Sequence, residues 1–100
     1  MLTLPIEKKW FDMILRGEKT EEYREIKPYW RERFHKAGLC FANGMPKMPA
    51  EVLFVNGYGN DRPAIKAKVR LSLGKGRPEW GAEPGAVYFK LIILEKVRVR

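Results

Sequence analysis

The chain has 100 residues, of which 45% are hydrophobic and 12% aromatic, so we expect one globular domain over residues 1–100 rather than a disordered chain. Twenty Lys and Arg against 12 Asp and Glu give a formal net charge of +8, spread over both halves of the chain, which favours a polyanionic partner. The single Cys excludes an intrachain disulfide, and no apolar run approaches the roughly 20 residues of a membrane-spanning helix; with no signal-peptide pattern either, we expect a cytoplasmic protein without a membrane.

The first predicted elements are a short strand over residues 2–4 and an amphipathic helix over about residues 6–16. Pro5 suits the first turn of that helix, and Gly17 suits the position that ends it. The apolar residues that recur at helical spacing are Ile6, Trp10, Met13 and Ile14. The period therefore assigns Trp10 to the core, with a base-stacking role as the alternative.

The next strand is predicted to run over residues 19–25. Strand alternation makes Glu22 and Arg24 neighbours on one face, close enough for an ion pair. Lys19 has the opposite parity, so it can join them only if the chain bends at Gly17, which glycine permits.

A second helix is predicted over residues 28–37, with Pro28 at its start and cations on its exposed face. Its apolar stripe consists of Trp30, Phe34 and Ala37. An irregular loop over residues 40–50 leads to a buried strand over residues 51–55. The glycine-containing turn that follows presents Tyr58, which could stack on a base or pack on the end of a barrel.

The clearest strand alternation covers residues 64–71, and it points three cations outward: Lys66, Lys68 and Arg70. This basic stripe could contact a phosphate backbone or protect an edge strand from pairing. A basic turn over residues 74–78 and an aromatic loop around Trp80 come next. Residues 87–94 are apolar on both faces, as in a central strand, and residues 96–100 alternate again.

The order strand, helix, strand, helix, then three or four strands predicts an α+β domain whose sheet curls into a small β-barrel with two or three flanking helices. One His and one Cys cannot build a usual zinc site, and the only Ser lies in a predicted strand, so we expect no metal, no cofactor and no serine triad. The side chains left for chemistry or binding gather in residues 17–24: Lys19, Glu22, Tyr23 and Arg24. Glu79 or Glu83 could add another carboxylate. An ordinary ion pair between Glu22 and Arg24 is the alternative without function.

The segment Gly17-x-Lys19-x-x-Glu22-x-Arg24, placed between a helix and a strand, resembles the G-x-K-x-x-E-x-R signature of the ASCH domain family, which belongs to the PUA-like superfold. The resemblance covers nearly the whole chain. It implies a small PUA-like barrel with a cleft lined by the motif, and it implies RNA binding. One branch of small bacterial members resembles an amidohydrolase that acts on N4-acetylcytidine with a Lys, a Thr and a Glu; Lys19 matches the Lys, whereas Glu22 stands in place of the Thr.

Three hypotheses follow. The first is a module that binds RNA, a nucleoside or a nucleotide through the side chains of the motif, Tyr58 and Trp80, with phosphates on the basic stripe. The second is a small hydrolase, an amidohydrolase or a ribonuclease, in which Lys19 is base or nucleophile and Glu22 relays protons. The third is an interaction domain whose motif only stabilises the barrel.

Overall fold

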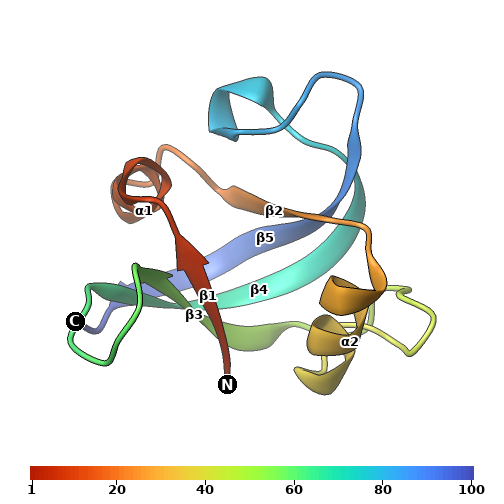
Figure 1. The fold of residues 1–100 in the computed structure, drawn as a ribbon, viewed down its shortest axis with the longest axis horizontal. Coiled ribbons are helices and arrows are strands. Elements are labelled where there is room, and N and C mark those ends of the chain that lie inside the picture. Colours follow the sequence, from red (N-terminus) through yellow and green to blue (C-terminus); the bar gives the residue numbers. More distant parts are fainter.

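The computed structural model describes residues 1–100 as a five-stranded sheet with two α-helices and one short 3-10 helix (Figure 1). The elements in chain order are β1 (Leu2–Ile6), α1 (Lys8–Leu15), β2 (Glu21–Glu25), α2 (Pro28–Lys36), β3 (Ala50–Asn56), β4 (Ala64–Lys75), η1 (Pro78–Trp80) and β5 (Val87–Arg98). The predicted order of elements is therefore confirmed, with three strands after the second helix. Neither helix combines the length and the hydropathy that crossing a membrane requires.

The sheet has the order β1-β3-β4-β5-β2. β1 pairs with β3 in parallel, and all other neighbours are antiparallel. β4 and β5 pair along nearly their whole length, with a shift of register between Lys68 and Val69. Because an irregularity of this kind bends a strand and increases its twist, the sheet curls into a half-barrel that leaves β1 and β2 as its two edges. The expected α+β class and the barrel-like curl of the sheet are thereby confirmed.

Several boundaries differ from those expected. Pro5 lies inside β1 and not at a helix start; an edge strand tolerates proline because its missing N–H is not needed by a second neighbour. β2 begins at Glu21, so Lys19 precedes the strand. The turn expected at residues 74–78 starts later, since β4 continues to Lys75. Residues 87–94 and 96–98 form one central strand.

The core is a cluster of fifteen buried side chains from both helices, from all strands except β2, and from Leu39 and Cys40 in the segment after α2. In α1 the buried residues are Phe11 and Ile14, and in α2 the buried residue is Phe34, whose ring meets that of Phe89 edge-on at 5.3 Å between centroids. The predicted inward face of β4 is confirmed, because its odd-numbered residues from Ile65 to Leu71 are buried.

The end of α1 sets the path into β2. Gly17 adopts a φ of 79°, and its N–H donates to the carbonyl of Ile14 at 3.0 Å. The N–H groups of Glu18 and Lys19 both donate to the carbonyl of Met13, at 2.9 and 3.1 Å. This is a Schellman-type helix end, which needs a residue that tolerates positive φ. It provides the bend at Gly17 on which the placement of Lys19 depends.

Candidate functional site

An open cleft of about 470 Å³ lies at the side of the half-barrel where β1, β2 and the helices come together. Six aromatic residues line it: Trp10, Tyr23, Tyr29, Trp30, Tyr58 and Trp80. All three tryptophans of the chain are among them. The volume is in the usual range for small-molecule sites, and the concentration of flat rings suits a planar ligand.

Two charged side chains of β2 line the same cleft, Glu22 and Arg24. Strand alternation predicts them on one face, and the structure confirms it: Arg24 Nη1 donates to Glu22 Oε2 at 2.7 Å. The Glu22 residue is only 6% exposed, so this carboxylate is removed from bulk water. A buried carboxylate of this kind is stable only because its charge is compensated and hydrogen-bonded.

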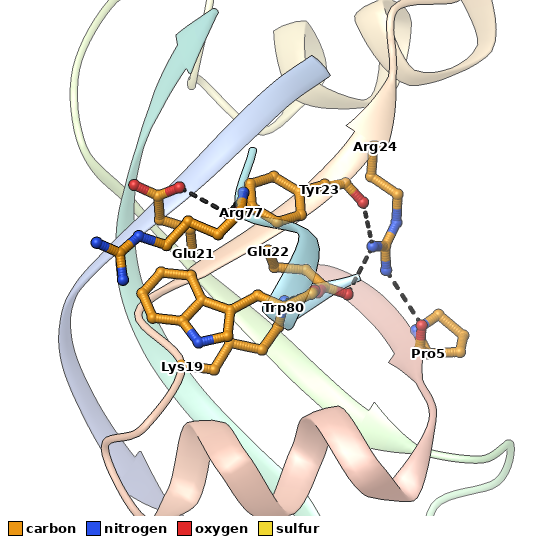
Figure 2. Close-up of polar contacts among 8 residues, drawn as sticks. All are labelled: Pro5, Lys19, Glu21, Glu22, Tyr23, Arg24, Arg77 and Trp80. Atoms are coloured by element: carbon orange, nitrogen blue, oxygen red, sulfur yellow. Dashed lines mark hydrogen bonds and ion pairs between the residues drawn. The ribbon is translucent and has the colours of Figure 1, made fainter. Parts of the chain in front are cut away.

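Arg24 also connects the two edges of the sheet. Its Nη1 donates to the carbonyl of Tyr23 at 2.7 Å, and its Nη2 donates to the carbonyl of Pro5 in β1 at 3.1 Å (Figure 2). Its guanidinium lies 5.2 Å from the ring centroid of Trp30. Arg24 therefore fixes the distance between β1 and β2, and with it the width of the cleft floor.

Lys19 lies behind Glu22. Its Nζ is 3.1 Å from Glu22 Oε1 and donates to the carbonyl of Trp80 at 2.6 Å, and its side chain has no exposed surface. The ammonium group also lies 4.9 and 4.8 Å from the ring centroids of Trp10 and Tyr23. Burial lowers the pKa of Lys19 from its ordinary value, while the neighbouring Glu22 opposes this shift. The structure thus joins Lys19 to Glu22 and Arg24, but it places Lys19 outside the set of residues that line the cleft.

Tyr23 anchors the loop that carries Trp80. Its hydroxyl donates to Glu21 Oε1 at 2.8 Å and accepts the N–H of Arg77 at 2.9 Å. Burial, more than any other cause, raises the pKa of Tyr23 to about 12, so the phenol remains a donor at neutral pH. Together with the bond from Lys19 to the carbonyl of Trp80, this contact holds η1 over β2 (Figure 2).

The two aromatic residues predicted to present rings, Tyr58 and Trp80, both line the cleft. Tyr58 is 85% exposed, whereas Trp80 is partly buried. Gly81 follows Trp80 with a φ of 101°, and a Cβ at this position would lie 3.0 Å from the ring of Trp10. The backbone therefore passes closely over Trp10, which only glycine allows.

The basic stripe lies elsewhere. Lys66, Lys68 and Arg70 alternate with the buried residues of β4, as predicted, and none of them lines the cleft. Lys66 Nζ is 3.8 Å from Glu51 Oε2, and Lys68 has Glu51 and Glu95 opposite it on the neighbouring strands. Part of the stripe's charge is compensated by these carboxylates.

Three aromatic cleft residues were not among the predicted site residues: Trp10, for which base stacking was only the alternative to a core position, Tyr29 and Trp30. The helical period assigns Trp10 to the core, yet the core takes its neighbour Phe11 instead. Trp30 both packs against the core and lines the cleft. In both helices two aromatic residues are adjacent in sequence, Trp10-Phe11 and Tyr29-Trp30. Adjacent helical residues point about 100° apart, so one of each pair had to leave the core face.

The chain matches no family model, no curated protein and no solved structure in the three comparisons made. The geometry of the cleft therefore carries the functional argument. The structure brings no three His, Cys, Asp or Glu side chains together in a way that could hold a metal ion.

Proposed function

We propose that this protein binds a base of RNA, or a modified nucleoside, in the aromatic cleft. The observation that carries the proposal is the ring of six aromatic residues around the Glu22–Arg24 pair. Base–aromatic stacking contributes about 1–3 kcal/mol per base in proteins that bind single strands. RNA-binding proteins read the edges of splayed bases with polar side chains while aromatic rings hold their faces. The resemblance of the motif to the ASCH signature, which includes Glu22 and Arg24, implies the same function.

The hydrogen-bonding capacity of the floor suits a base edge. Each oxygen of Glu22 has one cationic partner in the protein: Oε1 forms an ion pair with Lys19, and Oε2 accepts a hydrogen bond from Arg24. A carboxylate oxygen can accept two, so both oxygens retain capacity toward the cleft. A carboxylate accepts from amino and imino N–H groups, such as the N4 amino group of cytosine. We therefore expect cytosine, which has an amino group at this position, to bind better than uracil, which has a carbonyl oxygen there.

Intrinsic fluorescence gives a direct assay, because every tryptophan of the chain lines the cleft. The protein is titrated at low salt with single-stranded RNA hexanucleotides and with the free nucleosides, including N4-acetylcytidine. We expect saturable quenching. The variant Trp80→Ala should bind about 5- to 150-fold more weakly, as the loss of one stacking contact predicts.

The matched control is Phe41→Ala. Phe41 is half exposed and carries a stacked cation, Lys47 at 5.4 Å, but it does not line the cleft. Its removal should leave binding unchanged. If neither RNA nor nucleosides change the fluorescence of the wild type, the cleft is not a base-binding site, and the buried charges would only stabilise the barrel.

Hydrolysis is a second candidate, favoured by one observation: a lysine whose pKa is lowered by burial contacts the carboxylate that lines the cleft. Lys19 would have to release the carbonyl of Trp80 before it could reach a substrate. Incubation of the protein with N4-acetylcytidine and with RNA, followed by chromatography, tests both reactions. Release of cytidine or fragments by the wild type, abolished in a folded Lys19→Met variant, would establish catalysis. Absence of products from the wild type would rule out both reactions for these substrates.

A further inference from the structure

Besides Lys19 and Arg24, three further cations stack on aromatic residues that line the cleft. Lys9 Nζ lies 4.7 Å from the ring centroid of Trp10, and Arg77 Cζ lies 4.8 Å from that of Trp80. In α2, Arg33 Cζ lies 3.4 Å from the ring centroid of Tyr29. We call Lys9, Arg33 and Arg77 the rim cations. They come from α1, α2 and the loop before η1, so three different segments each place one cation on a ring that lines the cleft.

None of the rim cations forms an ion pair with a carboxylate. The seven ion pairs of the structure involve other Lys and Arg residues: Lys8, Arg16, Lys19, Arg24, Lys27, Lys66 and Lys90. Lys9 and Arg77 are also exposed. Glu7 and Glu22 are the carboxylates that line the cleft, and Glu22 is compensated by Lys19 and Arg24, so the three rim cations outnumber the one unpaired carboxylate of the lining, Glu7. A cation held on a ring but free of a counter-ion has its charge available to an anion beside that ring.

We propose that the rim cations contact the phosphates of a single-stranded RNA whose base occupies the cleft, so that the ligand is a nucleotide within a strand and not a free nucleoside. This inference rests on the proposed function and names the chemical class of its ligand. It also assigns the phosphate contacts to the rim cations instead of the basic stripe on β4. Neither set of cations lines the cleft, but the stripe has carboxylates beside it, whereas the rim places unpaired charge next to the rings on which a base would stack.

The test compares two triple variants that lose the same charge. The rim variant is Lys9→Gln, Arg33→Gln and Arg77→Gln. The stripe variant is Lys66→Gln, Lys68→Gln and Arg70→Gln. Each lowers the formal net charge from +8 by three, so a difference between them reports position and not total charge. Both are titrated with a single-stranded RNA hexanucleotide, and with the nucleoside of the same base, between 50 and 200 mM salt, after circular dichroism has confirmed the fold.

Each phosphate contact to a single strand contributes about −0.7 to the slope of log K against log salt. We expect the rim variant to lose about 2 from the slope and to bind RNA on the order of 100-fold more weakly at 0.1 M salt. The stripe variant should keep the wild-type slope, and nucleoside binding should be unchanged in both. The single variant Lys9→Gln, at an exposed position, should lose about 0.7 from the slope and replaces the triple variant if that variant misfolds.

Three outcomes would overturn the inference while leaving the proposed function intact: a wild type that binds nucleoside as tightly as hexanucleotide, a rim variant with an unchanged slope, or a stripe variant that loses the larger slope. A wild type that binds neither ligand would instead refute the proposed function itself.

Discussion

Replacement of Glu22 by Gln tests the buried charge network most directly. The change keeps the shape of the side chain but removes the charge that compensates Lys19, whose ammonium group has no exposed surface. Breaking a buried ion pair by removing one partner costs about 3–5 kcal/mol, because a charge is left unpaired away from water. The free energy of unfolding of a whole domain is about 5–15 kcal/mol, so this loss is a large fraction of the stability. With a urea m-value of about 1–3 kcal/mol/M, the unfolding midpoint should fall by at least about 1 M.

The stability that Glu22→Gln loses should depend on pH in a defined direction. Burial lowers the pKa of Lys19 in the folded protein below its unfolded value of about 10.5. Between these two pKa values the unfolded chain binds a proton that the folded chain lacks, so stability rises with pH across this window. Glu22 opposes the lowering, so its removal lowers the folded pKa of Lys19 further and widens the window toward neutral pH. The difference in stability between wild type and Glu22→Gln should therefore shrink as the pH approaches 10.

The double variant Glu22→Gln with Lys19→Met provides the control. Replacing the lysine by an apolar side chain of similar length removes one of the two cations that Glu22 compensates, while Arg24 keeps its bonds to the carbonyls of Tyr23 and Pro5. Part of the lost stability should therefore return, and the rise in stability with pH that Lys19 causes should be absent from the double variant. Urea unfolding followed by circular dichroism at pH 6 to 10 measures both quantities. A loss below about 1 kcal/mol for Glu22→Gln, or a double variant no more stable than the single one, would refute the description of Lys19 as a buried, compensated charge.

Two further predictions concern the packing around the site. A Cβ at Gly76 would lie 2.7 Å from the ring of Tyr23, so Gly76→Ala should destabilise the protein by about 1–3 kcal/mol in thermal unfolding. Gly74→Ala is the control, because its Cβ would meet only Lys90, at 3.7 Å. If the clash with Tyr23 is the cause, the control should lose less than about 1 kcal/mol. Cys40 is 1% exposed and burial raises the pKa of its thiol, so a thiol reagent should modify the folded protein at least about 100-fold more slowly than the urea-unfolded chain; equal rates would mean that the Cys40 region opens readily.

Local patterns predicted much of the fold. The alternation in residues 64–71 gave the inward and outward faces of β4 correctly, and the parity of Glu22 and Arg24 gave their ion pair. These predictions succeeded because each depends only on the period of one strand. Pro5 was assigned wrongly because its tolerance in a strand depends on β1 having only one neighbour, which is a property of the whole sheet.

The candidate site was only partly predictable for the same reason. Gly17 predicted the bend that brings Lys19 toward Glu22. The burial of Lys19 also depends on the segment around Trp80, whose carbonyl it contacts although Trp80 is 61 residues away along the chain. The position of Trp10 follows from competition with Phe11 for one place in the core, which helical period alone does not decide. The binding of RNA and any hydrolysis remain predictions for the experiments described above.

The position of β2 in the sheet also affects how the chain folds during its synthesis. β2 is an edge strand, and its only partner is β5, with Glu22 opposite Leu91 and Arg24 opposite Phe89. A chain emerging from the ribosome exposes β2 early, but β2 has no strand to pair with until residues 88–92 have been synthesised. The cleft floor therefore forms only when nearly the whole sheet is assembled. Nascent chains shorter than this lack the cleft floor, so the proposed ligand would bind only molecules whose sheet is complete.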